Sequence, residues 1–336
     1  MPKYIDRPDL PGPILTALLD PYYQEGLNEH FESLPDKIKK KVDGCPHFSV
    51  TTLARPARQR VLHNRHHDKV LLDPLKDGFW RMFGHVIHAI LEKSADADHL
   101  VEERLGCFVE VKVMGKKKRV YLHGQADLYD FRLKRIQDYK ISKAEALYYE
   151  NKDEYVFQLN ALAYIFRQNG HPVENLQNVY LLRNYDARRY VEGGKYPAEQ
   201  VVVVDIPVWD SERIKRAIIE RIHKHLTCEI LKDEELPPCS PQERWESPTL
   251  YKAYKMDKGE PQKRAKITSE SRMEVEDFIR DNSTDAKGKP VNYSVKEVAG
   301  EGVRCRFCDI AEFCEQRKTE LARLAEAGDE QEEIPE

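Results

Sequence analysis

The stretch RIQDYKISKA, residues 135–144, carries residue types that can act on a phosphate. Read as a strand, it places Asp138 and Lys140 on one face, because successive side chains of a strand alternate between two faces. A carboxylate beside an ammonium group can bind a cation and stabilise charge that develops on phosphorus. Taken alone, Asp-x-Lys is a common triplet, and an exposed ion pair on a solvated sheet is its more frequent explanation.

The preceding segment, GQADLYD, supplies a second carboxylate. If the two segments form a hairpin whose turn centres on Arg132 and Leu133, Asp127 pairs directly with Asp138. Two buried carboxylates at that separation repel each other, and a divalent cation removes the repulsion. Aspartate oxygens suit hard cations such as Mg²⁺ or Mn²⁺, so the hairpin predicts a metal site. Lys140 would then orient a water or stabilise the phosphate.

Four motifs stand in order along the chain: GHVIH (84–88), GQAD (124–127), DYK (138–140) and QLNALAY (158–164). The series resembles the PD-(D/E)XK nuclease superfamily, specifically its RecB-like branch, which includes CRISPR-associated and phage exonucleases. The resemblance covers roughly residues 48–230. It implies an α/β fold with a restriction-endonuclease-like core, in which helices flank a mixed central sheet.

The resemblance implies a role for each matching residue. The implied metal ligands are His88, Asp127, Asp138 and the main-chain carbonyl of Tyr139. The implied catalytic residues are Asp127, Asp138, the lysine Lys140, and Gln158, which would position the scissile strand or the lysine.

The implied activity is Mg²⁺- or Mn²⁺-dependent hydrolysis of phosphodiester bonds in DNA. The expected enzyme is an exonuclease on single strands or DNA ends, in phage or bacterial recombination, repair or DNA processing. The alternative is a catalytically inactive nucleic-acid-binding or assembly module that keeps the fold and the cysteine site. Intact site residues favour the enzyme. Three further carboxylates, Glu102, Glu103 and Glu110, are interpreted as structural, and the alternative is that one of them assists the metal.

The seven cysteines predict a second metal centre. CRFCDIAEFC places Cys305, Cys308 and Cys314 in a C-x2-C-x5-C run. An odd cysteine count in a reducing compartment disfavours a disulfide framework, and this spacing favours a soft metal, either zinc or an iron–sulfur cluster. RecB-like nucleases with a 4Fe–4S cluster end with the same run, so the resemblance implies that cluster, with zinc as the alternative. Cys239 is the preferred fourth ligand, and Cys45 is the other candidate.

Hydrophobic periodicity predicts the elements that must position these residues. Helices are expected at 48–66, 78–95, 154–170 and 211–230, and strands at 99–114, 118–131, 133–142, 178–185 and 198–209. Expected caps are Ser49 or Thr51 for the first helix and Ser211 for the last, with Gly170 ending the third. The helix at 78–95 carries an apolar stripe of Phe79, Met82, Val86, Ile90 and Leu91.

Four regions are expected along the chain. Residues 1–47 form a helical N-terminal extension, and residues 48–232 form the nuclease core. Residues 233–320 form a subdomain clamped by the cysteine cluster, and residues 321–336 form a disordered acidic tail.

Charge is unevenly distributed, which bears on the expected partner. The net charge is −4, but six acidic residues and no basic one lie between Glu326 and Glu336, so the remainder is slightly positive. Basic clusters at 55–67, 112–119 and 251–266 fit a DNA partner. The longest clean aliphatic run, VVVV, is too short to span a membrane, and no signal peptide is visible, so a cytoplasmic location is expected. The chain contains no G-x-x-x-x-G-K-[ST] motif, so any helicase or recombination partner would act in trans.

Overall fold

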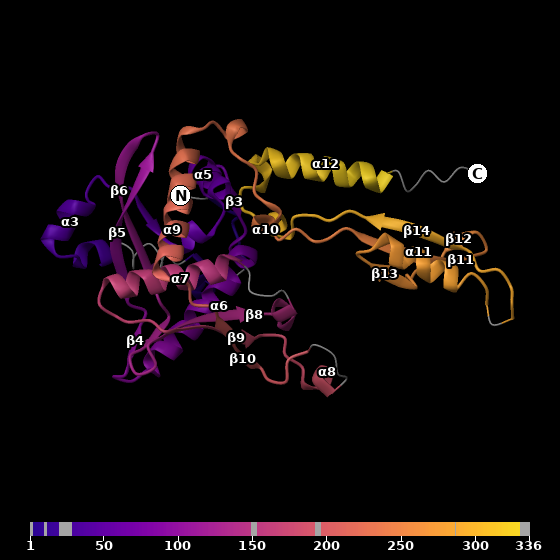
Figure 1. Ribbon diagram of the computed structural model, residues 1–336, viewed down its shortest axis with the longest axis horizontal. Coiled ribbons are helices and arrows are strands. Elements are labelled where there is room, and N and C mark those ends of the chain that lie inside the picture. The colour runs from indigo at the N-terminus through magenta and orange to yellow at the C-terminus, as the bar shows by residue number, and fades with distance from the viewer. Residues whose placement is uncertain are drawn as a thin grey trace. The chain divides into compact units, whose positions relative to one another are not determined.

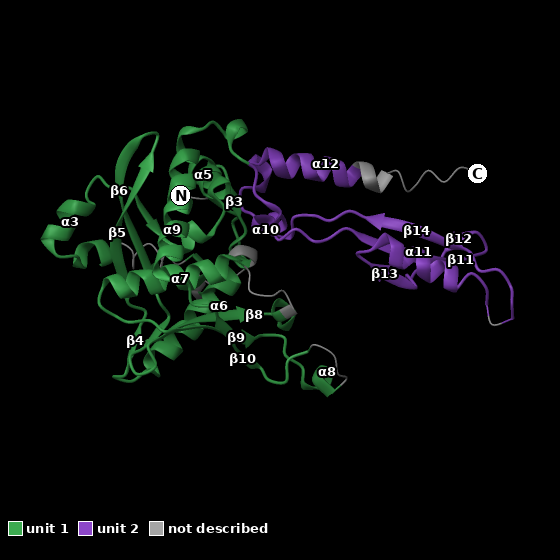
Figure 2. Ribbon diagram, viewed as in Figure 1, with its two compact units in different colours: residues 1–237 green, residues 238–336 purple. Residues whose placement is uncertain are grey.

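The chain forms two compact units, residues 1–237 and 238–336 (Figure 2). This computed structural model describes residues 3–9, 12–19, 29–148, 153–191, 196–285 and 287–329. The first unit therefore contains both the segment expected as an N-terminal extension and the expected nuclease core. Among the described residues, no helix has the length and apolar character needed to cross a membrane.

A mixed five-stranded sheet lies at the centre of the first unit. Its strand order is β10-β9-β8-β7-β4. β8 and β9 are parallel, and the other neighbours are antiparallel. A parallel pair needs a crossover, and α7 provides it here. The bounds are β4 (His99–Val101), β7 (Leu128–Asp130), β8 (Arg135–Ser142), β9 (Asn175–Leu182), β10 (Val201–Ile206) and α7 (Asp153–Gln168).

A second sheet of three strands has the order β2-β6-β5. Its strands are β2 (His47–Ser49), β5 (Arg104–Val113) and β6 (Lys116–Gln125), and Figure 1 shows β5 and β6 as a long hairpin. The strand expected at 99–114 is thus divided into β4 and β5, and the one expected at 118–131 into β6 and β7. In each case the two halves belong to different sheets. The predicted unbroken strands were wrong at these two breaks.

Helix α7 forms the core by packing against strands of both sheets and against α9 (Ser211–Ile230) and α4 (Val50–Ala54). Half of the residues of α7 are buried, including Phe157, Leu162 and Phe166. Ser49 caps α4, as expected, by accepting a hydrogen bond from the Thr52 amide. The predicted cap of α9 was wrong by one residue: Asp210, not Ser211, accepts from the Arg213 amide. An aspartate oxygen satisfies this free N–H as well as a serine does.

Smaller elements complete the first unit. These are β1 (Lys3–Tyr4), α1 (Gly12–Leu19), α3 (Asp36–Val42), α5 (Ala57–His66), β3 (Leu71–Leu72), α6 (Pro74–Lys93), the 3₁₀ turns η1 (Ala144–Tyr148) and η2 (Asp233–Glu235), and α8 (Ala187–Val191). β1 and β3 form a separate parallel pair. Helix α7 ends before Gly170, whose φ of +86° is a left-handed conformation that glycine adopts without strain.

The second unit has its own sheet, in which β11 lies between β13 and β14. Its elements are α10 (Pro241–Arg244), β11 (Leu250–Asp257), β12 (Glu260–Pro261), β13 (Ile267–Ser269), α11 (Arg272–Asp281), β14 (Tyr293–Val298), η3 (Val303–Phe307), η4 (Ala311–Phe313) and α12 (Glu315–Asp329). α12 includes residues 321–329, which the sequence predicted to be a disordered tail. That part of the prediction was wrong, and residues 330–336 lie outside the described chain.

Asn160 on α7 offers a test of the core. It is 1% exposed; its side-chain oxygen accepts from the Trp209 amide at 2.7 Å and its nitrogen donates to the Pro207 carbonyl at 2.9 Å. Asn160→Leu leaves both main-chain groups without this partner, and we expect a loss of about 1 to 3 kcal/mol in the free energy of unfolding, measured with urea. Gln168→Leu, at an exposed position of the same helix, should change it by less than about 0.5 kcal/mol. Equal stability of the two variants would contradict this account of the core.

Candidate active site

Three carboxylates lie at corresponding positions of neighbouring segments: Asp138 in β8, Asp127 just before β7 and Glu102 just after β4. Leu128 pairs with Gln137, and continuing this register places Asp127 opposite Asp138, as the sequence predicts for a turn at Arg132–Leu133. On the other side, two ladders share one register, since Val101 pairs with Leu128 and Arg104 with Gln125. The same register places Glu102 opposite Asp127, at the point where both strands pass from one sheet to the other.

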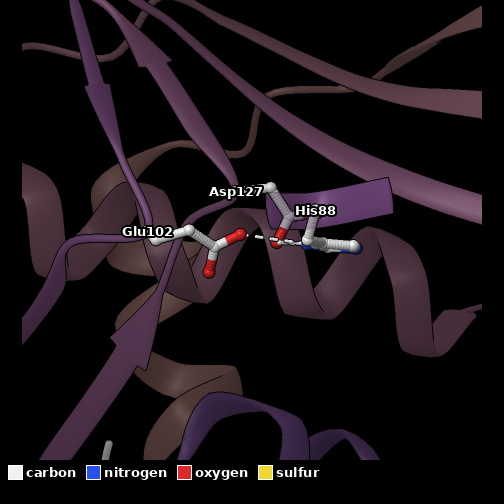
Figure 3. Close-up of side chains that lie close together, drawn as sticks. All are labelled: His88, Glu102 and Asp127. Carbon is white, nitrogen blue, oxygen red and sulfur yellow. Dashed lines mark hydrogen bonds and ion pairs between the residues drawn. The ribbon is translucent and has the colours of Figure 1, made fainter. Parts of the chain in front are cut away.

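Glu102 belongs to the site, although the sequence reading treated it as structural. His88 Nδ1 lies 3.0 Å from Glu102 Oε1 and 3.6 Å from Asp127 Oδ1. One ligand atom from each of the three residues lies within 4.8 Å of the others. Figure 3 shows both carboxylates turned toward the His88 ring. An imidazole nitrogen and two carboxylates are a donor set that Mn²⁺ and Mg²⁺ accept, so these residues fit a divalent cation.

A signal for Glu102 exists in the sequence. Met114 and Gly115 form a two-residue turn, with φ of +49° and +78°, between Val113 and Lys116. A turn of this kind fixes the register of the whole hairpin. Counting back from it leads to the pairing of Glu102 with Asp127.

The backbone and neighbours of Glu102 hold its carboxylate in place. Its φ of +50° is a left-handed conformation that costs a non-glycine residue energy, and such residues are frequent at functional sites. Gln125 Nε2 donates to Glu102 Oε2 at 2.6 Å, and Arg104 in turn donates to the Gln125 side chain. The hydrogen bond to Glu102 raises the pKa of His88.

Asp127 is held by the main chain of the next strand. The Tyr139 N–H donates to Asp127 Oδ2 at 2.6 Å. Burial raises the pKa of Asp127 to about 7, and the charge of Asp138 adds to the rise. The sequence predicts that the main-chain carbonyl of Tyr139 binds a metal, which stays a prediction. The structure shows the Tyr139 N–H donating to Asp127.

Asp138 is engaged by the two other residues expected to act in catalysis. Lys140 Nζ lies 2.5 Å from Asp138 Oδ2, and Gln158 Nε2 donates to Asp138 Oδ1 at 3.0 Å. Burial lowers the pKa of Lys140, but the attraction of Asp138 outweighs it, and the pKa is raised to about 12. Asp138 therefore lies beside the His88, Glu102 and Asp127 cluster and is not a member of it. The metal-binding role predicted for Asp138 stays a prediction, and Glu102 is a further candidate ligand.

Helix α6 brings His88 to the sheet. Asp73 caps this helix by accepting from the Leu75 amide, and Pro74 occupies its first position. The apolar stripe expected on this helix is largely uncovered: Phe79, Val86 and Ile90 are 37%, 50% and 55% exposed. Periodicity shows that a helix is amphipathic but does not show what covers it.

The four cysteines expected to bind a cluster, Cys239, Cys305, Cys308 and Cys314, all belong to the second unit. Burial raises the pKa of Cys308 to about 11, and the nearby Cys305 and Cys314 add to the rise. The Gln316 side chain accepts from the Cys239 N–H at 2.8 Å and donates to the Cys239 carbonyl at 2.9 Å. This pair of bonds ties Cys239 to the helix that follows Cys314. Thiolates are the ligands that soft metals prefer, so a metal centre held by these four cysteines stays a prediction. Cys45, the other candidate, lies in the first unit.

Comparison with known proteins yields distant structural likeness only. No protein-family model matches the chain, and no curated protein matches its sequence. The crystal structure of SSO0001 is 16% identical with a TM-score of 0.38, over 59% of this chain and 82% of that one. The crystal structure of a phage-related exonuclease from Haemophilus somnus 129PT is 13% identical with a TM-score of 0.27, over 50% of this chain and 78% of that one. At these scores the likeness carries no inference about activity.

Burial of Asp127, together with the nearby charge of Asp138, predicts a gain in stability when Asp127 is neutralised. A carboxyl whose pKa is raised on folding stabilises the protein at low pH and loses that contribution as pH rises through the folded pKa, here about 7. With a chelator present at pH 8, the free energy of unfolding of Asp127→Asn should therefore exceed that of the parent by about 1 to 3 kcal/mol. At pH 5 the advantage should shrink, as measured by urea denaturation. The exposed control Asp98→Asn should show no such pH dependence. A parent stability that rises from pH 5 to pH 8 relative to Asp127→Asn would contradict the prediction.

Proposed function

We propose that this chain is a Mg²⁺- or Mn²⁺-dependent deoxyribonuclease that hydrolyses phosphodiester bonds in single-stranded DNA or at DNA ends. The observation that carries the proposal is the His88, Glu102 and Asp127 cluster beside the ion pair of Asp138 and Lys140. The order of motifs that resembles RecB-like nucleases supports it. Action as an exonuclease in recombination, repair or DNA processing belongs to the same proposal.

The residues of the site divide the work. His88, Glu102 and Asp127 would hold the cation. When bound, the cation would stabilise charge at the phosphate and lower the pKa of a water, so that this water loses a proton more readily and can attack the phosphorus. Lys140 is an ammonium donor placed by Asp138, so it can hold a phosphate oxygen or orient the attacking water. Gln158 fixes Asp138 through its hydrogen bond and thereby the position of the lysine.

The proposal includes a 4Fe–4S cluster held by Cys239, Cys305, Cys308 and Cys314. The link between Cys239 and Gln316 supports Cys239 as the fourth ligand, because it holds this cysteine near the helix that follows Cys314. The cluster would have a structural role and would tie the chain ends of the second unit together. A partner such as a helicase would act in trans.

Metal-dependent cleavage tests the enzyme. With Mn²⁺ and end-labelled single strands, the parent should degrade DNA, and Asp127→Ala and Lys140→Ala should each lower the rate by at least about a hundredfold. Mn²⁺ should also raise the melting temperature of the parent but not of Asp127→Ala, because a ligand stabilises the state that binds it.

Lys143→Ala, three residues along and exposed, is the matched control and should retain activity. Free-ended and circular substrates distinguish exonuclease from endonuclease action. DNA binding without cleavage by the parent would favour the inactive binding module, and cleavage that survives both substitutions would refute the site.

Metal analysis and visible absorbance test the cysteine site. Protein purified without oxygen should be brown, with about four iron atoms per chain. Cys239→Ser and Cys314→Ser should each lose colour and iron, and Cys45→Ser should keep both. A colourless protein with one zinc per chain would contradict the cluster, and loss of iron in Cys45→Ser would reverse the choice of fourth ligand.

A further inference from the structure

A pocket of about 260 Å³ adjoins the candidate active site. It shares His88, Tyr139 and Lys140 with that site. Its other principal lining residues are Trp80, Gly84, Tyr155 and Tyr180. A ligand in this pocket therefore lies next to the groups that would act on a phosphate.

One face of helix α6 forms a wall of the pocket. Trp80, Gly84 and His88 follow one another at intervals of four residues, so they lie on the same side of the helix. Gly84 lies in the middle of the row. A Cβ atom built there meets nothing within 4 Å, so the glycine leaves open space between the indole and the imidazole. Glycine inside a helix costs about 0.5 to 1 kcal/mol of stability relative to alanine. At position 84 the lack of a side chain keeps the pocket open.

The remaining walls offer flat aromatic surfaces and positive charge. Trp80 is 49% exposed, whereas Tyr180 is 6% exposed and forms part of the buried floor. Lys140 Nζ lies 4.7 Å from the centre of the Tyr155 ring. The exposed Arg183 guanidinium lies 3.6 Å from the centre of the Trp80 ring. Aromatic rings stack on nucleobases without regard to sequence, and an arginine beside them can contact a backbone phosphate.

We infer that this pocket binds the unpaired base of the nucleotide next to the scissile phosphate. The inference rests on the proposed function, because it takes the phosphate to lie at His88 and Lys140. A base that is paired and stacked in a duplex must leave the helix to enter such a pocket, and this extrusion costs energy that a single strand does not spend. The pocket thus selects single strands and frayed ends, with no preference for sequence.

Filling the pocket at Gly84 is the sharpest test of binding. Gly84→Leu should extend into the open space, and Gly84→Ala is the matched control that leaves most of it free. The probe is oligothymidylate with one 2-aminopurine at its 3′ or 5′ end, a fluorescent base whose emission falls when it stacks on an aromatic ring. Ca²⁺ replaces Mn²⁺ to slow cleavage, and fluorescence anisotropy reports total binding.

We expect quenching at one of the two ends with the parent and with Gly84→Ala, and its loss with Gly84→Leu. The melting temperature of Gly84→Leu should equal or exceed that of the parent, because leucine favours a helix more than glycine does. Trp80→Ala should also lose the quenching. Binding of the probe by the parent without quenching at either end would overturn the inference.

Cleavage of strands that lack one base at each position in turn gives the second test. With the parent, removal of the base that enters the pocket should lower the Mn²⁺-dependent rate roughly fivefold to a hundredfold, the range typical of one base stacked on protein aromatics. Gly84→Leu should cleave the complete strand at the rate of the base-deleted strand, and Gly84→Ala should follow the parent.

Equal rates on complete and base-deleted strands would refute base binding in the pocket and would not contradict the nuclease proposal. Quenching by a parent that cleaves nothing would refute the nuclease proposal and keep the pocket. Base dependence that persists in Gly84→Leu would place the base elsewhere.

Discussion

Mutual repulsion of Glu102, Asp127 and Asp138 is the constraint around which the first unit is arranged. The pairing registers place these carboxylates in one row across three neighbouring strands. Two neighbouring groups offset part of this charge: Lys140 is paired with Asp138, and His88 lies against Glu102 and Asp127. Burial raises the pKa of Asp127 and the charge of Asp138 adds to the rise, so these neighbours do not offset the whole cost of ionising this carboxyl group. A fold that keeps this cost needs a cation to remove it, which is the physical argument for a metal site.

The compensation is distributed unevenly, and this separates two roles. Asp138 forms an ion pair with Lys140 and accepts a hydrogen bond from Gln158, so its main effect is to place the lysine. Glu102 and Asp127 face one imidazole between them, and these three residues could hold a cation. Three acidic residues at similar positions thus have different chemistry because their neighbours differ. The sequence alone does not separate these roles, since spacing shows which residues are near one another but not which neighbour compensates each charge.

The sequence predicted those parts of the site that local rules determine. The pairing of Asp127 with Asp138 followed from the centre of one turn, because a hairpin turn fixes every later pair. Glu102 was interpreted as structural because the register of the hairpin at Met114 and Gly115 was not followed back to Asp127. The change of sheet depends on packing: α7 contacts both sheets, and no local pattern encodes that. Packing also decides the exposure of the apolar stripe that includes Val86 and Ile90. The sequence predicts this stripe but does not predict that both side chains are exposed.

The break between the sheets also explains how the main chain serves the site. The β7–β8 ladder ends with the pair of Leu128 and Gln137, so it stops one pair short of Asp127 and Asp138. Beyond that point the Tyr139 N–H donates to the carboxylate of Asp127. At the same break, Glu102 takes a left-handed backbone conformation that a regular strand does not allow. A continuous sheet would place the same residues opposite one another without this donor or this bend. The irregularity is therefore what brings Glu102 and Asp127 into one cluster with His88.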